Sequence, residues 1–257
     1  MYYIIVISIA LVLFYFFFVK KNNNSQKTIV EIPPLWHDLL IENVNFYKQL
    51  TDDNQLRFRK RMRSFLNKVS IEAVGFELED LDKVLVAASA VIPIFNFENW
   101  NYPNIYTVLI YPDYFNKQLQ FTNTEKDRNI GGLVGTGRFE NQMILSKKAL
   151  YHGFFNKTDK GNTGIHEFVH LLDKLDGSVD GIPERLLNIK NATPWLNLMY
   201  NKMEAINNNT SDIRNYGGTS REEFFAVASE YFFERPKLLR RKHPELYKML
   251  SVCFGNK

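Results

Sequence analysis

The segment NTGIHEFVHLLDKLDG, residues 162–177, joins an apolar helical pattern to the motif H-E-x-x-H. His166 and His170 are four residues apart, so in a helix they lie on one face about one turn apart. Two imidazoles in this arrangement can bind one zinc ion. Glu167 would lie beside the metal, where a carboxylate can take a proton from bound water. The segment therefore predicts a helix that carries two zinc ligands and a general base.

The helix start and the remaining histidines agree with this interpretation. Asn162 or Thr163 is placed to cap the first turn. The chain has five histidines, and two of them fall in the motif. The alternative is a pair of hydrogen-bonded histidines on a helix that binds no metal. The other three, His37, His152 and His243, have no such partners in the sequence, and we interpret them as structural or surface residues.

A catalytic zinc site needs a third protein ligand and one open position for water. Asp173 lies on the same helical face as the two histidines of the motif. It lies about 10 Å along the helix axis from His166, because the rise is about 1.5 Å per residue. One straight helix therefore cannot supply all three ligands. We expect Asp173 to orient a histidine, and the third ligand to come from another helix.

A second helix is predicted within residues 216–236, YGGTSREEFFAVASEYFFERP. Glycines before it and a proline at its end set its limits. Glu223 and Glu230 lie two turns apart on one face of this helix. Spacing therefore leaves either glutamate as the third ligand, with a modest preference for Glu223 near the helix start.

Two capping boxes compete at the start of this second helix. Thr219-x-x-Glu222 is one of them and leaves the Glu223 carboxylate free. Ser220-x-x-Glu223 is the other and would use that carboxylate in the cap. The assignment of Glu223 as a ligand assumes the first box, so Glu222 is expected to serve the cap.

Composition places the chain among folded globular proteins. Of its 257 residues, 45% are hydrophobic and 23% are charged, which excludes disorder over the whole length. The formal charge of +4 comes from 32 basic and 28 acidic residues and is too small to predict direct nucleic-acid binding. Cys253 is the only cysteine, so an intramolecular disulfide and a cysteine zinc site are excluded.

Strands are predicted at residues 105–111 and 143–145, with a glycine-rich turn between them. Apolar spacing predicts helices at 36–50, 53–69 and 83–95. The predicted strands come before the motif-bearing helices. We therefore expect an α+β fold rather than a doubly wound sheet.

The helix predicted at 53–69 has two contrasting faces. One face carries an apolar stripe: Phe58, Met62, Phe65, Leu66 and Val69. The other face carries basic residues: Arg57, Arg59, Lys60, Arg61 and Arg63. We interpret the basic face as solvated, and contact with anionic lipid headgroups is the alternative.

The run YYIIVISIALVLFYFFFV, Tyr2–Val19, is long enough to cross a bilayer as a helix. The alternative is a cleaved signal peptide. That alternative is disfavoured because only Met1 precedes the run and no small-residue cleavage pattern follows it. Lys20 and Lys21 come directly after the run, so the positive-inside rule leaves the rest of the chain in the cytoplasm.

Four stretches together carry a family resemblance. They are HEFVHLLDKLDGSVDGIP, the pattern Y-x6-EFFAVASEYFFERP, LVAASAVIPIF and YTVLIYPDYF. These stretches closely resemble the zinc peptidases of the Mlc titration factor A family, whose catalytic domain is similar to that of anthrax lethal factor. The resemblance implies a zincin-like metallopeptidase domain, in which the H-E-x-x-H helix packs on a small sheet.

The resemblance also implies roles for five residues. His166, His170 and Glu223 would bind Zn²⁺ as in a gluzincin, Glu167 would be the catalytic base, and Tyr216 would stabilise the oxyanion. The implied activity is aminopeptidase-like hydrolysis of a peptide or protein substrate. The alternative is a module that sequesters a transcription regulator, with hydrolysis secondary or absent, because the best-known family member binds the repressor Mlc. An intact Glu167 favours catalysis, since binding alone needs no base.

These interpretations divide the chain into three parts. Residues 1–21 form a transmembrane anchor, residues 22–32 a linker, and residues 33–257 a zinc peptidase domain. The expected location is the cell membrane, with a single crossing and the domain in the cytoplasm. The anchor is a departure from the family, whose best-known member is a soluble cytosolic protein.

The topology can be tested by adding protease to intact cells. We expect residues 33–257 to remain uncut until the membrane is opened, because Lys20 and Lys21 hold this part on the cytoplasmic side. Immunoblotting against the domain follows the cleavage. A mature N-terminus located after Lys21, with the protein in the soluble extracytoplasmic fraction, would contradict this topology.

Overall fold

The computed structural model describes residues 32–98, 100–122, 124–135, 137–184, 186–187 and 189–255. The predicted transmembrane segment Tyr2–Val19 lies outside these residues. Among the helices that are described, none combines the length and the apolar character needed to cross a bilayer. The described residues belong to one folded unit.

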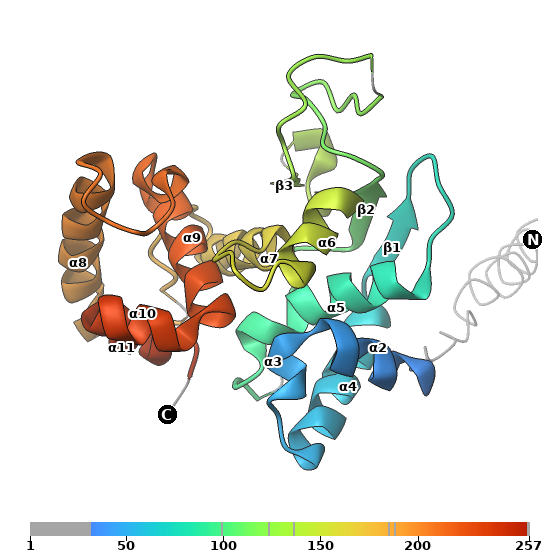
Figure 1. Ribbon diagram of the computed structural model, residues 1–257, viewed down its shortest axis with the longest axis horizontal. Helices are drawn as coiled ribbons and strands as arrows, with labels where there is room; N and C mark the ends of the chain where they lie inside the picture. The colour runs from blue at the N-terminus through green and yellow to red at the C-terminus, as the bar shows by residue number, and fades with distance from the viewer. Residues whose placement is uncertain are drawn as a thin grey trace, which may run out of the picture. The chain divides into compact units, whose positions relative to one another are not determined.

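Helices make up most of the N-terminal half of the described chain (Figure 1). They are α2 (Leu35–Asn43), α3 (Asn45–Lys48), α4 (Asp52–Leu66) and α5 (Asp80–Ile94). The helix predicted at 36–50 is therefore two helices, because the backbone of Val44 is extended while its side chain is buried. The helix predicted at 53–69 ends at Leu66. Four residues of its predicted apolar stripe are buried and Leu66 is partly buried; the four are Phe58, Met62 and Phe65 of α4, and Val69 just after it.

Four of the described strands form one sheet in the order β1-β2-β4-β3. They are β1 (Ser70–Ala73), β2 (Thr107–Tyr111), β3 (Gly132–Val134) and β4 (Gln142–Ser146). The first three strands in this order are parallel, and β3 is antiparallel to β4. The strands predicted at 105–111 and 143–145 are the central strands β2 and β4. The sequence does not predict the edge strands, and β3 lies within the segment that we interpreted as a turn.

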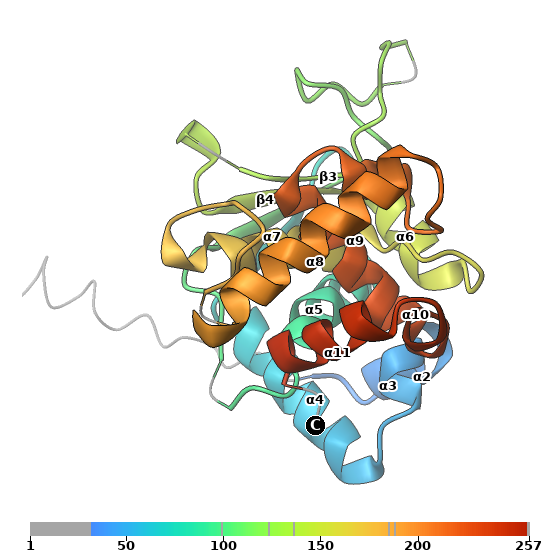
Figure 2. The same cartoon turned by 90° about the vertical axis from the view of Figure 1, so that its left-hand side faces the viewer.

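The two faces of the sheet pack against different parts of the chain. Val108, Ile110, Met143 and Leu145 project into the main core beneath the helices. Ile144 and Tyr111 project to the other side, where they meet side chains from residues 112–131. This segment connects β2 to β3 and extends away from the sheet in Figures 1 and 2. Because helices cover one face only, the arrangement agrees with the α+β class.

The C-terminal half of the described chain is also helical. Its elements are α6 (Lys147–Phe155), α7 (Thr163–Asp173), η4 (Lys174–Asp176), α8 (Ile189–Asn207), η5 (Asn215–Gly218), α9 (Arg221–Glu234), α10 (Pro236–Lys242) and α11 (Pro244–Cys253). A short 3-10 helix, η3 (Gly137–Phe139), precedes β4. The two helices that the motifs predict are therefore α7 and α9.

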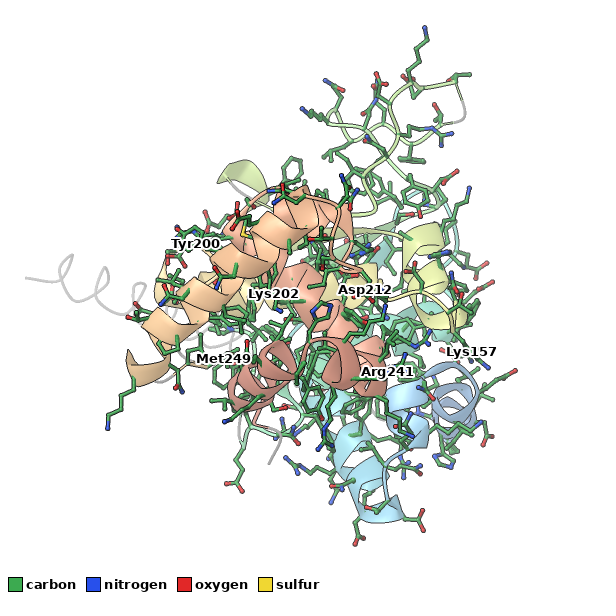
Figure 3. The ribbon with its side chains drawn as sticks, turned by 60° about the vertical axis from the view of Figure 1, so that its left-hand side comes forward. Lys157, Tyr200, Lys202, Asp212, Arg241 and Met249 are labelled. Carbon is green, nitrogen blue, oxygen red and sulfur yellow. The ribbon has the colours of Figure 1, made fainter. Side chains whose placement is uncertain are left out.

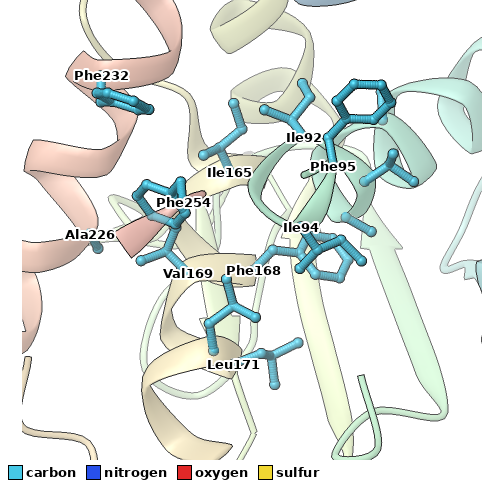
Figure 4. Packing of buried hydrophobic residues seen from close by; sticks show 14 of the residues in the cluster. Ile92, Ile94, Phe95, Ile165, Phe168, Val169, Leu171, Ala226, Phe232 and Phe254 are labelled. Atoms are coloured by element: carbon cyan, nitrogen blue, oxygen red, sulfur yellow. The ribbon is translucent and has the colours of Figure 1, made fainter. Parts of the chain in front are cut away.

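Helix α7 lies at the centre of the core, where it packs against both α5 and α9 (Figures 1 and 2). Its apolar side chains lie among those of the two neighbouring helices and of the C-terminal Phe254 (Figure 4). At Gly164 a Cβ atom would lie 2.1 Å from Ser89 Oγ of α5, so only glycine permits this close approach. Packing on both sides fixes the rotation of α7 about its axis, and with it the direction of the histidines.

Candidate active site

The H-E-x-x-H helix begins as predicted. Asn162 is the N-cap of α7, and its side-chain oxygen accepts a hydrogen bond from the N–H of Ile165 at 3.1 Å. This geometry identifies Asn162 rather than Thr163 as the cap. His166 and Glu167 are only 8% and 6% exposed. The polar motif therefore lies in largely buried surroundings.

The start of α9 differs from the prediction. Ser220 is the N-cap, and its hydroxyl accepts a hydrogen bond from the N–H of Glu223 at 3.4 Å. The cap predicted from Thr219 and Glu222 is therefore wrong. Thr219 still belongs to the preceding turn, because its hydroxyl donates to the carbonyl of Tyr216 at 2.7 Å. The Glu223 backbone takes part in the cap, while its carboxylate reaches the histidines of α7.

The three predicted ligands come together at one point. His166 Nε2 lies 3.0 Å from His170 Nε2 and 3.0 Å from Glu223 Oε2. His170 Nε2 lies 3.6 Å from the same carboxylate oxygen. One ligand atom from each residue falls within 4.8 Å of the others, which is compatible with one metal ion. Two turns of α7 and the first turn of α9 thus form a His/His/Glu cluster.

Glu230 lies on the other side of the His166 ring and is not part of this cluster. Its Oε1 accepts a hydrogen bond from His166 Nδ1 at 2.7 Å, and its side chain is 1% exposed. It also accepts from the guanidinium of Arg214 and from the backbone N–H of Asn162. Glu230, which spacing leaves as an alternative ligand, therefore orients a ligand instead.

The Glu230 contact determines which nitrogen of a neutral His166 carries the proton. Nδ1 donates to the carboxylate, so Nε2 keeps its lone pair. That lone pair faces Glu223 Oε2, a buried oxygen to which a neutral His166 has no proton to donate. Two facing acceptors 3.0 Å apart repel each other unless a cation or a proton lies between them. Two imidazole nitrogens and one carboxylate oxygen are ligands that suit zinc, so the residues fit this ion.

The electrostatics of the cluster also favour a cation. Burial acts to lower the pKa of His166, but the charge of Glu230 and the hydrogen bond to Glu223 raise it above its usual range. Burial acts to raise the pKa of Glu223, but the hydrogen bonds from His166 and His170 hold it well below its usual range. Each residue is therefore stabilised in its charged form by the opposite charge next to it. A metal ion between them would supply the positive charge without protonating the imidazoles.

Asp173 does not orient a histidine as predicted. Its side chain is fully buried, and its Oδ2 accepts a hydrogen bond from the N–H of Gly181 at 2.8 Å. Gly181 has a φ of +76°, and its carbonyl accepts from the indole of Trp195 at 2.7 Å. Asp173 thus anchors the turn that follows α7, and the orienting role belongs to Glu230.

The side chain of Glu167 projects from α7 toward Gly132 of the edge strand β3. A Cβ atom at Gly132 would lie 2.6 Å from both Cγ and Oε1 of Glu167. The glutamate therefore fits only because β3 has no side chain there, a role that the glycine-rich pattern alone does not reveal. Burial raises the pKa of Glu167, with the histidines acting against it and the other carboxylates adding to it. A raised pKa suits a group that accepts and then donates a proton.

Tyr216 lies at the mouth of the site, in the short helix η5. Its ring centroid is 6.0 Å from that of His166, and 52% of the residue is exposed. Burial on its inner side and the charge of Glu223 raise the pKa of the Tyr216 hydroxyl. The hydroxyl therefore keeps its proton at neutral pH and can donate a hydrogen bond into the site.

Asp212 anchors the segment that carries Arg214 and Tyr216. It accepts from Lys160 Nζ at 2.7 Å, His243 Nε2 at 2.7 Å and Tyr231 Oη at 2.9 Å. Figure 3 shows it after α8, beside α10. Burial acts to raise the pKa of Asp212, but these donors hold it well below its usual range. The sequence does not predict this anchor, although it identifies His243 correctly as a structural residue.

The cluster opens into a hollow of about 500 Å³. Its walls include His166, Glu167, Arg214 and Tyr216, together with Gly132 of the edge strand. The remaining lining comes from α6, from the loop that leads into α7, from the segment between β2 and β3, and from Glu230 of α9. A molecule in this hollow would contact Glu167, Tyr216 and His166.

Two histidines on an H-E-x-x-H helix, joined by a glutamate from a second helix, are typical of a metallopeptidase site. The chain belongs to the family described as glucose-regulated metallo-peptidase M90, which matches residues 19–255. This membership assigns the chain to a family of metallopeptidases.

Three individual relatives share between 28% and 29% of their residues with this chain. An uncharacterized protein of Synechocystis sp. is 29% identical over 234 residues, which cover 87% of this chain and 84% of the relative. Mlc titration factor A of Escherichia fergusonii is 28% identical over 246 residues, with 90% and 89% covered. The protein of the same name from Cronobacter sakazakii is 28% identical over 222 residues, with 80% of each chain covered. The similarity therefore extends over nearly the full length of these relatives.

Replacing Glu230 tests its orienting role. We expect Glu230→Gln to weaken zinc binding by about 10–100-fold, because the neutral amide holds the His166 ring less firmly and removes a charge. Competition with a chromophoric chelator measures the affinity. His170→Ala sets the value for a lost ligand, and Glu222→Gln is the matched control on the same helix. Zinc binding by Glu230→Gln equal to that of Glu222→Gln would show that Glu230 does not support the metal ligand.

Proposed function

We propose that this protein is a zinc-dependent peptidase with His166, His170 and Glu223 as ligands. The observation that carries the proposal is the convergence of three ligand atoms within 4.8 Å, on helices that the core holds rigidly. Zinc at this position would act as a Lewis acid toward water and the scissile carbonyl.

The chain's own residues supply the remaining steps. Glu167 accepts the proton of the attacking water at its carboxylate and later donates it to the leaving amine. Its close fit against Gly132 holds the carboxylate in one place. The Tyr216 hydroxyl donates a hydrogen bond to the negative charge that develops on the carbonyl oxygen. Arg214 and Glu230 keep the His166 ring oriented throughout.

An extended peptide is the substrate that the surroundings favour. Among the described strands, β3 pairs with β4 alone, so its second edge offers unpaired backbone groups. A peptide can add to such an edge by main-chain hydrogen bonds. Gly132 of β3 touches Glu167, so a peptide along this edge would bring a carbonyl next to the base. This arrangement supports peptide or protein substrates.

Binding of a transcription regulator is the second candidate. Several relatives are named Mlc titration factor A, a name that describes titration of Mlc. For this chain we rank regulator binding below hydrolysis, because sequestration needs neither Glu167 nor a metal centre. We further propose a single-pass membrane protein with its domain in the cytoplasm, on the strength of the sequence at Tyr2–Val19 and its flanking lysines.

Glu167→Gln separates the two candidates. We expect the variant to retain zinc and to lose peptide hydrolysis by at least about 10²-fold, because it removes the proton acceptor. Mass spectrometry of a peptide library measures the products and also shows which peptide end is attacked. Glu222→Gln is the control. Unchanged hydrolysis in Glu167→Gln would refute the proposed mechanism, while regulator binding by a wild-type protein that cleaves no peptide would favour the second candidate.

Tyr216→Phe tests the hydrogen bond to the oxyanion. We expect zinc binding to stay unchanged and kcat to fall by about 10²-fold, the low end for the loss of one such donor. Tyr200→Phe, an exposed tyrosine on α8 that Figure 3 labels, is the matched control. Steady-state kinetics on the best library peptide supply both values. Equal kcat in the two variants would remove Tyr216 from the mechanism.

A further inference from the structure

A second hollow, of about 480 Å³, lies outside the active site. It is formed by α4, by the C-terminal end of α5 and by part of the segment that follows α5. None of its lining residues lines the hollow at the metal cluster. Its walls carry four cationic side chains and one carboxylate: Arg57, Lys60, Arg61, Lys68 and Glu98. We name it the α4 hollow.

The two arginines of the α4 hollow are fixed by the backbone. Arg57 Nη2 donates to the carbonyl of Phe95 at 2.6 Å, and Arg61 Nη1 donates to that of Ile94 at 2.6 Å. Arg61 also donates to the carbonyl of Phe97. These carbonyls lie at and just after the C-terminal end of α5, where carbonyls have no partner within the helix; that of Ile94 also accepts from the N–H of Phe97 at 3.1 Å. The basic face of α4 is therefore not simply solvated, as the sequence suggests, because part of it caps the neighbouring helix.

The two lysines of the α4 hollow differ from its arginines. Lys60 and Lys68 are exposed and form no ion pair with any described residue. Burial and the charge of Arg57 both lower the pKa of Arg61, so the cations of the hollow destabilise one another. Glu98 supplies the only negative charge among the lining residues. An anion between the lysines and the arginines would relieve this repulsion.

The floor of the α4 hollow is apolar and aromatic. Val91 and Ile94 of α5 contribute aliphatic surface, and Trp100 and Tyr102 contribute rings. The Tyr102 hydroxyl already donates to the carbonyl of Ala90 at 2.8 Å. The indole Nε1 of Trp100 is buried and has no hydrogen-bond partner. The hollow therefore combines several cationic groups with an apolar surface.

We propose that the α4 hollow binds the phosphate group of an organic phosphate ester. Lysine ammonium groups and guanidinium groups are the side chains that bind phosphate oxygens. The apolar floor suits the carbon part of the ester. Two sources share this chemistry, a phospholipid headgroup and a free phosphate ester. The hollow is independent of the metal cluster, so the proposal does not rest on peptidase activity.

Lysine footprinting on the full-length chain tests the proposal. The protein is held in dodecyl maltoside micelles, which contain no phosphate, and acetylation rates of Lys60 and Lys68 are measured by mass spectrometry. One arm adds glycerol 3-phosphate, and the other adds phosphatidylglycerol to the micelles. We expect both lysines to react about tenfold more slowly at ten times Kd, by mass action. Protection in the first arm identifies a free ester, and protection in the second arm alone identifies a headgroup.

Three controls make the outcome decisive. Lys202 of α8, labelled in Figure 3, is the internal reference because it lies outside the α4 hollow. Lys60→Gln should weaken the protection of Lys68, whereas Arg63→Gln on the same helix should leave it unchanged. Acetate at equal ionic strength controls for screening. No protection in either arm, equal protection by acetate, or no effect of Lys60→Gln would each overturn the proposal.

Discussion

The buried carboxylate of Glu230 is the contact on which the rest of the site depends. It accepts hydrogen bonds from His166 Nδ1, from the N–H of Asn162 and from Arg214, so it joins α9 to the start of α7 and to the segment before η5. A carboxylate with 1% exposure is stable only when its oxygens are satisfied in this way. The same hydrogen bonds position the cap of α7, the ring of its first histidine and the segment that carries Tyr216.

Much of the candidate site could be predicted from the sequence because it is local. The spacing of His166 and His170 places both on one face of any helix, and Asn162 caps that helix wherever it lies. The choice between Glu223 and Glu230 is different, because both glutamates contact the same imidazole from opposite sides. The Glu223 carboxylate lies 3.0 Å from Nε2 and the Glu230 carboxylate 2.7 Å from Nδ1. Only the packing of α9 against α7 determines which carboxylate joins the cluster.

The wrong predictions share a physical cause. Asp173 and Thr219 were assigned roles from neighbours along the chain, whereas their side chains bind a turn and a preceding carbonyl. The sequence predicts a solvated basic face for α4, yet Arg57 and Arg61 bind carbonyls at the end of α5, more than thirty positions further along the chain. Central strands β2 and β4 are recognisable because they are buried and apolar. The edges β1 and β3 are short and half exposed, so their patterns are weak.

Among charged side chains, the hollow at the His/His/Glu cluster contains mainly carboxylates, whereas the α4 hollow contains mainly cationic ones. The two also differ in burial, and burial determines how strongly like charges repel each other. At the metal cluster, Glu167, Glu223 and Glu230 face one guanidinium in largely buried surroundings, where charge is poorly screened. Helix packing brings these carboxylates together whether or not an ion is bound, so the fold itself creates the demand for a cation. In the α4 hollow the arginines have carbonyl partners and the lysines reach solvent, so water and salt screen much of the repulsion. A metal ion in the cluster would thus help to stabilise the core of this protein, whereas the proposed anion at α4 would bind as a separate, salt-sensitive event.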